Sequence, residues 1–334
     1  MALAGLGVLA LGAGWALSSN LGEGGASGVS GALAFPGLTA KLEGVGEVDV
    51  DHQGQTLQVV RVGDVWGLPA KGGYLIEQNK LHAILTGLTE LRLTEPRTSD
   101  PDEYARLGVE DPTRPTASSS LLRVLDGSGS AVVELIVGHR RVRTQGNVPD
   151  TVYVRRPGEA QSWLAEGRLE VDADPQLWID RDIANIDHAK IASATVTRGD
   201  QLLVFARQGD AFALTAPAAH PKLDDYKVED VARSFETLTL MDVRPAASEP
   251  GERIGSALFT TTDGETISVT LFKVAGDKDR QIWGQFEVTG AGAEALEKRV
   301  HGWAYQLGAW KEAAFLPTME TLKAAEPAPA AAPK

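Results

Sequence analysis

Two stretches of the sequence follow the same plan: VWGLPAKGGYLIEQNKLHAILTGLTELRL (residues 65–93) and AFALTAPAAHPKLDDYKVEDVARSFETLTL (residues 211–240). In each stretch, apolar residues recur at i, i+3, i+4, i+7 and i+10. A helix with 3.6 residues per turn places such a series on one face. The spacing therefore predicts one amphipathic helix in each stretch. The two series are Leu81, Ile84, Leu85, Leu88 and Leu91, and Val228, Val231, Ala232, Phe235 and Leu238.

Short alternating segments precede both predicted helices. In the first copy they are residues 47–50, 56–62 and 64–68; in the second, residues 195–198, 201–206 and 210–214. Turn formers such as glycine and aspartate separate them. Each set predicts an antiparallel meander whose last strand carries an aromatic core residue, Trp66 or Phe212.

The segments after the two helices also correspond. Each copy has a strand, a proline-rich connection and a hairpin whose turn is Asp-Gly, at residues 126–127 and 263–264. Asp-Gly between β-forming residues favours a hairpin because both residues tolerate positive φ. A further strand follows, at residues 151–156 or 281–288. Each copy is then expected to end in a short helical segment with tryptophan, VDADPQLWIDRDI or VHGWAYQLGAW.

These patterns predict an α+β fold of two tandem, internally duplicated modules after an N-terminal membrane segment. Each module has a mainly antiparallel sheet and one main amphipathic helix, because the connections are too short for repeated βαβ crossovers. The expected divisions are a membrane segment (1–20), a Gly/Ser-rich tether (21–44), the first module (45–190), the second module (191–318) and a disordered Ala/Pro-rich tail (319–334).

The N-terminal segment allows three interpretations. Residues 2–17 are uncharged and mostly apolar, and a Gly/Ser-rich stretch follows them. They form a signal-anchor helix, a cleaved signal peptide or a buried helix. The first basic residue is Lys41, whereas both leader readings expect one before the apolar run. We expect a single-pass anchor in the inner membrane with most of the chain in the periplasm; secretion after cleavage is the alternative.

Composition excludes several functional classes. The net charge of −13 argues against a nucleic-acid partner, because neutralising phosphates requires a basic surface. The absence of cysteine excludes disulfides, thiolate metal sites and cysteine nucleophiles. No P-loop, G-x-S-x-G elbow or H-E-x-x-H motif is present. The sequence therefore predicts a non-enzymatic protein without catalytic, cofactor or metal sites. An aspartate cluster within residues 172–187 is assigned to helix capping and a solvated face.

One group of basic residues suggests a binding site. Arg140, Arg141 and Arg143 follow one predicted strand, and Arg155 and Arg156 end the next. If the two strands pair, we expect the guanidinium groups to converge and contact a carboxylate or phosphate of a partner. The alternative is that these arginines face nearby Asp and Glu residues of the same chain.

The order of motifs resembles a bacterial family known as domain of unknown function 4340. The matching segments are the Trp66-Gly67-Leu68 run with its helix, EYARLGVEDP (103–112), ELIVG (134–138), TVYVRRPG (151–158) and QLWIDRDI (176–183). The usual Tyr-Gly-Leu of the family is rearranged here between Tyr104 and Gly108. The resemblance implies a membrane-tethered protein encoded beside ABC-2 transporters of the gliding-motility type. It implies no catalytic residues.

Three functions remain open on the sequence. The first is an extracytoplasmic accessory protein that contacts ABC transporter subunits. The second is a periplasmic binding protein for an anionic envelope glycan or peptide. The third is a hydrolase whose site is not recognisable from the sequence.

Overall fold

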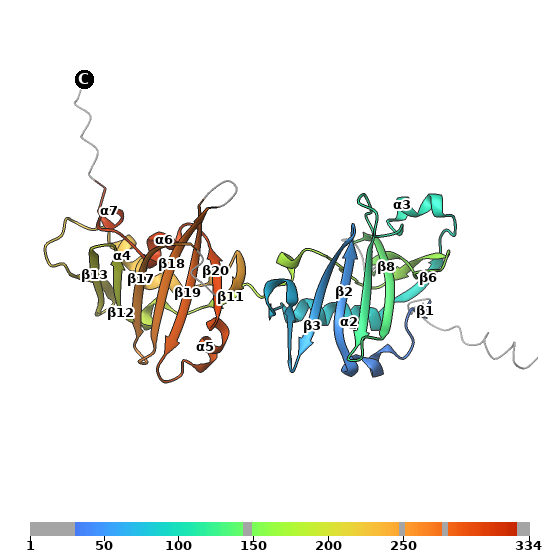
Figure 1. Cartoon of the computed structure of the whole chain (residues 1–334), viewed down its shortest axis with the longest axis horizontal. Coiled ribbons are helices and arrows are strands. Elements are labelled where there is room, and N and C mark those ends of the chain that lie inside the picture. The colour runs from blue at the N-terminus through green and yellow to red at the C-terminus, as the bar shows by residue number, and fades with distance from the viewer. Residues whose placement is uncertain (1–30, 143–148, 247–250, 276–279, 326–334) are drawn as a thin grey trace, which may run out of the picture.

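The computed structural model of the chain describes residues 31–142, 149–246, 251–275 and 280–325. Figure 1 shows two lobes lying end to end, each built on a twisted sheet with helices against one face. The expected membrane segment and residues 21–30 of the expected tether lie outside the described residues. Within the described ranges, no helix combines the length and the apolar character needed to cross a bilayer.

The first sheet has ten strands, ordered β1-β6-β10-β9-β8-β7-β2-β3-β4-β5 in space. All neighbours in it pair antiparallel. The strands are β1 (Ala32–Leu33), β2 (Val45–His52), β3 (Gln55–Val62), β4 (Val65–Leu68), β5 (Tyr74–Leu75), β6 (Arg92–Pro96), β7 (Ser120–Asp126), β8 (Ala131–Arg141), β9 (Thr151–Arg155) and β10 (Ser162–Glu166).

The second sheet has eight strands, ordered β14-β13-β12-β17-β18-β19-β20-β16, and it too is antiparallel throughout. Its strands are β12 (Ile191–Arg198), β13 (Gln201–Gln208), β14 (Ala211–Ala216), β16 (Asp242–Pro245), β17 (Glu252–Thr261), β18 (Thr266–Ala275), β19 (Arg280–Thr289) and β20 (Trp303–Leu307). Two short strands, β11 (Asp182–Ala184) and β15 (Leu238–Thr239), form a separate pair.

The two sheets share one strand order. Read from β4 to β6, the first sheet is β4-β3-β2-β7-β8-β9-β10-β6, and adding ten to each label gives the order of the second sheet. The meanders, the hairpins and the strand after each hairpin are therefore present as predicted. The fold is α+β with antiparallel sheets. Each sheet also has a strand that we did not predict, β10 or β20, and the first sheet has two more, β1 and β5.

Two main helices cover the sheets. They are α2 (Gln78–Glu90) and α4 (Asp225–Ala232), which continues as the 3₁₀ turn η6 (Arg233–Phe235). The remaining helices are η1 (Leu38–Gly44), η2 (Pro69–Lys71), η3 (Pro101–Glu103), α3 (Tyr104–Leu107), η4 (Pro175–Leu177), η5 (His188–Lys190), α5 (Glu294–Val300), α6 (Lys311–Phe315) and α7 (Met319–Leu322).

The predicted helix faces are the buried ones. Leu81, Ile84 and Leu88 of α2 lie in the core, and so do Val228 and Val231 of α4. The expected aromatic anchors also pack there, with Phe212 buried and Trp66 half-buried. The second helix is shorter than its spacing suggested, since the apolar series runs on through η6 into β15.

Three segments differ from the sequence expectation. VHGWAYQLGAW forms a strand, β20, rather than a helix, because Trp303 to Leu307 complete the sheet beside β19. The end of the expected tether is ordered, since Ala34 and Leu38 are buried in the core. The start of the expected tail is ordered as well: α7 is followed by a bridge between Leu223 and Lys323. Residues 326–334 of the tail lie outside the described residues.

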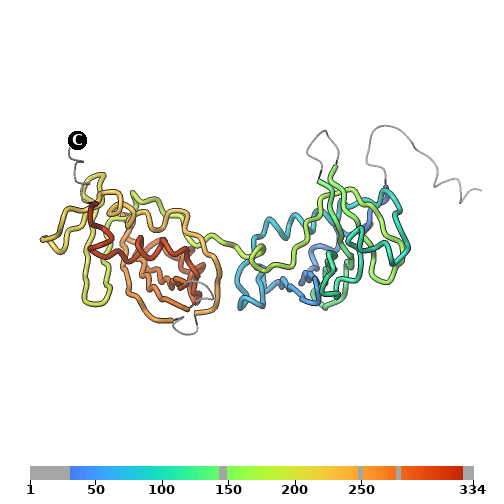
Figure 2. Tube along the Cα trace, turned by 90° about the horizontal axis from the view of Figure 1, so that it is seen from above, coloured from blue at the N-terminus to red at the C-terminus, as the bar shows by residue number. Residues whose placement is uncertain are grey.

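Side chains from both lobes meet at a small junction. The ammonium of Lys71 lies 2.6 Å from Oδ1 of Asp242, which also accepts from Gln176 at 3.1 Å. The ring of Tyr74 packs edge-on against Trp303, with centroids 4.9 Å apart. Figure 2 shows the chain between β10 and β12 passing from one lobe to the other. The lobes are therefore joined by packing as well as by the covalent chain.

Candidate functional site

The predicted arginine cluster is dispersed by the strand register. Arg140 and Arg141 end β8, and this strand pairs with β9 as expected. Arg140 lies opposite Val152, at the start of β9, whereas Arg155 lies opposite Ile136. Because β8 has a bulge between Val137 and Arg140, three residues of β9 separate the two positions, which is about 10 Å at the usual rise per residue. The expected convergence of the guanidinium groups is therefore wrong.

Each of the described arginines has partners inside the first lobe, and Arg143 lies outside the described residues. Arg140 and Arg156 each lie within ion-pair distance of a carboxylate, at 2.7 Å from Glu170 and 3.8 Å from Glu159, and carbonyl oxygens and aromatic rings supply the other contacts. The partners are Glu170 for Arg140, the Tyr153 ring for Arg141, the Val109 carbonyl and the Tyr104 ring for Arg155, and the Ala34 carbonyl for Arg156. Contact of these arginines with an outside anion remains a prediction.

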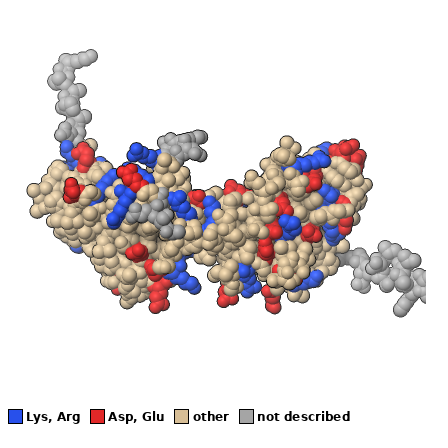
Figure 3. Space-filling model, in the orientation of Figure 1, with Lys and Arg blue, Asp and Glu red and all other residues tan. Residues whose placement is uncertain are grey.

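A groove with a cavity volume of 770 Å³ runs along α2 and contains Arg140. The solvent-facing side of α2 forms one wall, and the chain between β10 and η4 forms the other. Charged residues of both signs line it in equal number: Lys80, Arg140 and Arg168, and Glu90, Glu170 and Asp172. Figure 3 shows acidic and basic side chains interspersed on the visible face of this lobe as well.

A glycine sets the shape of this groove. A Cβ atom on Gly87, in the middle of α2, would lie 2.3 Å from the carbonyl oxygen of Arg168. Only glycine allows the backbone to approach the helix this closely. Leu169, the next residue, is buried in the core and holds the segment down. The charged side chains of Arg168 and Glu170 are thereby left at the rim.

The charges within the groove partly compensate one another. Oε1 of Glu170 lies 2.7 Å from Arg140 and 3.3 Å from Arg168. Burial raises the pKa of Glu170, but the two guanidinium groups outweigh it, so that the pKa is lower than usual. Burial lowers the pKa of Lys80, against the opposing effect of Asp172. The groove thus offers paired charges rather than a block of one sign.

A serine and a histidine lie close together in the first lobe without forming a catalytic pair. Oγ of Ser120 is 3.3 Å from Nδ1 of His52, which lies 2.8 Å from the carbonyl oxygen of Ser119. A carbonyl oxygen can only accept a hydrogen bond, so Nδ1 carries the proton. It cannot then take a proton from Ser120, as a general base must.

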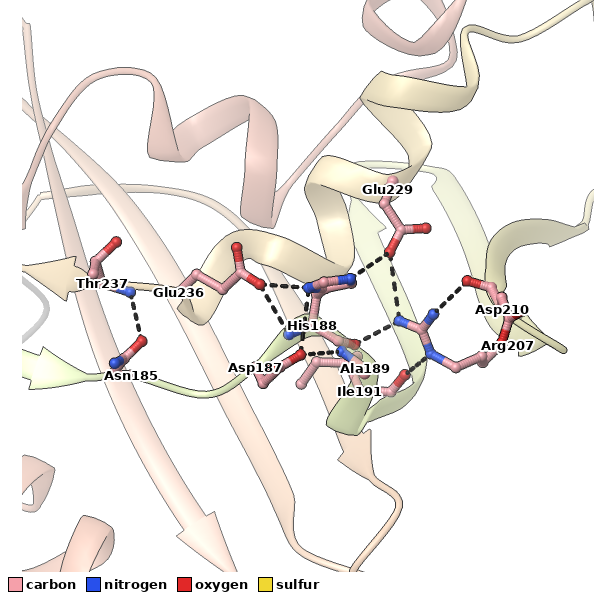
Figure 4. Close-up of polar contacts among 10 residues, drawn as sticks. All are labelled: Asn185, Asp187, His188, Ala189, Ile191, Arg207, Asp210, Glu229, Glu236 and Thr237. Carbon is pink, nitrogen blue, oxygen red and sulfur yellow. Dashed lines mark hydrogen bonds and ion pairs between the residues drawn. The ribbon is translucent and has the colours of Figure 1, made fainter.

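A second polar cluster lies where the second lobe begins (Figure 4). Nδ1 of His188, in η5, is 2.5 Å from Oε1 of Glu236, and the backbone N–H of His188 donates to the same oxygen. On the other side of the ring, Nε2 lies 4.0 Å from Glu229 of α4. Arg207 donates to the carbonyl of His188 and faces Glu229. Burial raises the pKa of Glu236, but the hydrogen bonds from His188 outweigh burial, so that the pKa lies below its usual value.

Asp187, His188 and Glu236 place their possible ligand atoms within 4.8 Å of one another. Metal binding would require a free lone pair on histidine. Nδ1, however, faces a carboxylate oxygen at hydrogen-bonding distance and is its donor. Oδ1 of Asp187 is likewise used, since it caps η5 through the N–H of Ala189. The geometry fits a set of hydrogen bonds that holds η5 against the end of η6 better than it fits a metal site.

The aspartates singled out in the sequence act mainly on local backbone. Asp174 caps η4 by accepting from Gln176, and Asp172 accepts from the N–H of Asp174. Asp180 instead forms an ion pair with Arg299 of the second lobe. The capping interpretation is therefore confirmed for Asp174 and Asp187.

Sequence reasoning missed most of the groove residues. Lys80, Arg168 and Glu170 are ordinary charged residues in the sequence, and only the fold brings them to Arg140. One available signal was Gly87, because a glycine inside an amphipathic helix often indicates close packing. No comparable signal marked Glu229 and Arg207.

Comparison with known proteins identifies the family. No curated protein and no solved structure matches the chain. A family model described as Domain of unknown function (DUF4340) matches residues 66–254, which include α2, the groove and most of the first half of the second sheet. The match covers more than half of the chain, as the ordered motifs had indicated, and the protein belongs to the DUF4340 family.

Proposed function

We propose that this protein is a non-enzymatic accessory of an ABC-type transport system, which acts through protein–protein contacts. In this proposal residues 1–20 tether it to the inner membrane, and both lobes are extracytoplasmic. The apolar N-terminal run and the family resemblance support the tether and the partner.

The groove along α2 is the observation that carries the proposal. It is 770 Å³ in volume, and its cations and carboxylates are equal in number. A polypeptide carries both signs of charge and can complement such a surface. A polyanionic glycan would meet Glu90, Glu170 and Asp172 as well as the cations, and Arg140 is already paired with Glu170. The groove therefore favours a protein partner over an anionic envelope ligand.

Site-specific crosslinking in native membranes tests this proposal. A photoreactive residue replaces His82, an exposed groove residue on α2, in the full-length protein. We expect crosslinks to the permease or ATP-binding subunit of an ABC transporter. The matched control carries the same residue at Val62, which is 71% exposed on β3 and is not among the groove residues.

Crosslinks at position 82 but not at 62 would support the proposed contact. Equal labelling from both positions, or none to a transporter subunit, would count against it. In that case, binding of an anionic glycan or peptide, compared between wild type and the Arg140→Ala/Arg141→Ala variant, becomes the next test.

We also propose that the two modules arose by internal duplication. The shared strand order and the repeated helix spacing support this history. Profiles built from residues 45–190 and 191–318 of many family members should align with each other better than shuffled profiles do. Alignment no better than the shuffled controls would refute the idea.

A further inference from the structure

The two sheets differ at one edge. In the first sheet, β4 is covered by β5, with Gly67 opposite Leu75 and Leu68 opposite Tyr74. The corresponding strand of the second sheet is β14, and no described strand pairs with its outer side. An edge strand with free backbone groups is a template for another strand. The same position thus holds a strand of the chain itself in one lobe and is open in the other.

A groove lies beside this open edge. It has a cavity volume of 540 Å³ and lies between β14 and α4. Phe212, Leu214, Leu223 and Val228 give it an apolar lining. Leu214 and Leu223 are only half-buried, so that apolar surface remains available to a ligand.

Backbone groups of β14 point into the groove. The alternating pairs of an antiparallel ladder turn every second residue away from its neighbour. The N–H of Phe212 confirms this phase, because it donates to Glu229 of α4 at 3.0 Å rather than to β13. Leu214, two residues on, presents its N–H and C=O on the same side, and these groups bond to no other described residue. Glu229 closes the groove at the hairpin end, so pairing centres on Leu214.

We propose that β14 and α4 form a peptide-binding groove, in which an extended segment of a partner protein adds to the second sheet as a strand beside β14. Main-chain hydrogen bonds at Leu214 align the segment, and apolar side chains at alternate positions pack against Leu223 and Val228. The strand that covers β4 in the first lobe, with Tyr74 and Leu75, is of this apolar kind. The site is separate from the α2 groove and does not depend on a transporter being the partner.

A displayed library of random eight-residue peptides, selected on the purified full-length protein, tests the proposal. We expect enriched peptides with apolar residues at alternate positions. Affinities of one synthetic winner are then compared between two variants. Leu214→Pro removes the N–H that faces the groove, and Leu214→Ala shortens the side chain but keeps the N–H. We expect the proline variant to bind about tenfold more weakly than the alanine variant.

A second measurement does not depend on any protein variant. N-methylation of the peptide, one residue at a time, should weaken binding at every second residue only, because an added strand uses alternate N–H groups. Equal effects at all positions, equal binding by both variants, or no enriched peptide would overturn the proposal. So would a dimer in sedimentation that Leu214→Pro dissociates, because β14 would then pair with a second copy of this chain.

Discussion

A buried carboxylate in the first sheet gives a prediction at the scale of one residue. Asp49 is almost completely buried, and Glu47 and Asp51 lie near it on β2. Burial, followed by the charge of Glu47, raises the pKa of Asp49 to about 6, although Arg123 opposes the change. The folded state therefore keeps a proton that the unfolded state releases near pH 4. Stability from this group is present below that pH and is lost as pH rises through about 6.

Asp49→Asn should remove this pH dependence. We expect the free energy of unfolding to rise by about 2 kcal/mol at pH 8 and to change little at pH 4, since a neutral side chain needs no desolvation of charge. Denaturant unfolding at both pH values measures the difference. Asp51→Asn is the control, because Asp51 pairs with Arg123 at 2.7 Å and its loss should not stabilise. A variant less stable than wild type at pH 8 would contradict the prediction.

The glycine of the α2 groove gives a second prediction at this scale. Gly87→Ala improves helix propensity by about 1 kcal/mol but forces the new Cβ against the carbonyl of Arg168. Overpacking of this kind costs about 1–3 kcal/mol, so we expect a net loss of stability or a displaced groove wall. Thermal unfolding measures the change in melting temperature, and Thr86→Ala, a neighbouring substitution on the same helix, is the control. A melting temperature above that of wild type would show that the wall moves freely.

At the scale of elements, the two Asp-Gly hairpins connect their strands through turns of different conformation. In the β17–β18 hairpin, Gly264 has φ of 90°, as the Asp-Gly signal implies. In the β7–β8 hairpin the left-handed residue is Gly129, and Gly127 is not among the residues with positive φ. The dipeptide thus predicted a turn correctly in both places, whereas its conformation depends on the two residues that follow Gly127.

This difference predicts unequal effects for matched substitutions. Gly264→Ala should lower the free energy of unfolding by about 1–2 kcal/mol, because alanine is strained at positive φ. Gly127→Ala should be within about 0.5 kcal/mol of wild type, since no steric or conformational demand applies there. Chemical denaturation of the two variants tests the comparison directly. Equal losses would contradict the assigned turn conformations.

Local patterns also decided how much of the structure could be foreseen. Alternation and turn residues located β2, β3, β12 and β13 within a few residues, and 3.6-residue spacing gave the buried face of α2. β20 was missed because WAYQL has no clear alternation, and its state is fixed by its neighbours in the sheet, β19 and β16. The expected convergence of the arginines was wrong for a related reason. Pairing of β8 with β9 was predictable, but the register was not, and the register decides which side chains meet.

At the scale of the whole molecule, the junction makes the angle between the lobes dependent on a few contacts. Burial raises the pKa of Asp242, but hydrogen bonds from Lys71, Val243 and Gln176 outweigh it and hold the pKa below its usual range. A carboxyl with a depressed pKa stabilises above the unfolded value and loses this effect as pH falls through the folded value. The junction should therefore be intact at neutral pH and loosen only below about pH 4.

Distance measurements between the lobes test this behaviour. The chain has no cysteine, so spin labels can be placed at Val62→Cys and Leu202→Cys, both exposed and one on each lobe. We expect Asp242→Asn to broaden the distance distribution at pH 7. Asp263→Asn is the control, because it removes an ion pair with Lys190 inside the second lobe. Distributions that are identical for all three proteins would show that the salt bridge does not hold the lobes.

The end-to-end arrangement of the lobes has a mechanical consequence. Strand β1 lies at the outer end of the first lobe, and α7 lies at the opposite end of the molecule (Figure 1). If the N-terminal tether is in the membrane, as proposed, the first lobe stands near the bilayer and the second projects away from it. The stiffness of the junction then limits the range of positions that the second lobe can take, and with it the volume within which the open edge of β14 can meet a partner.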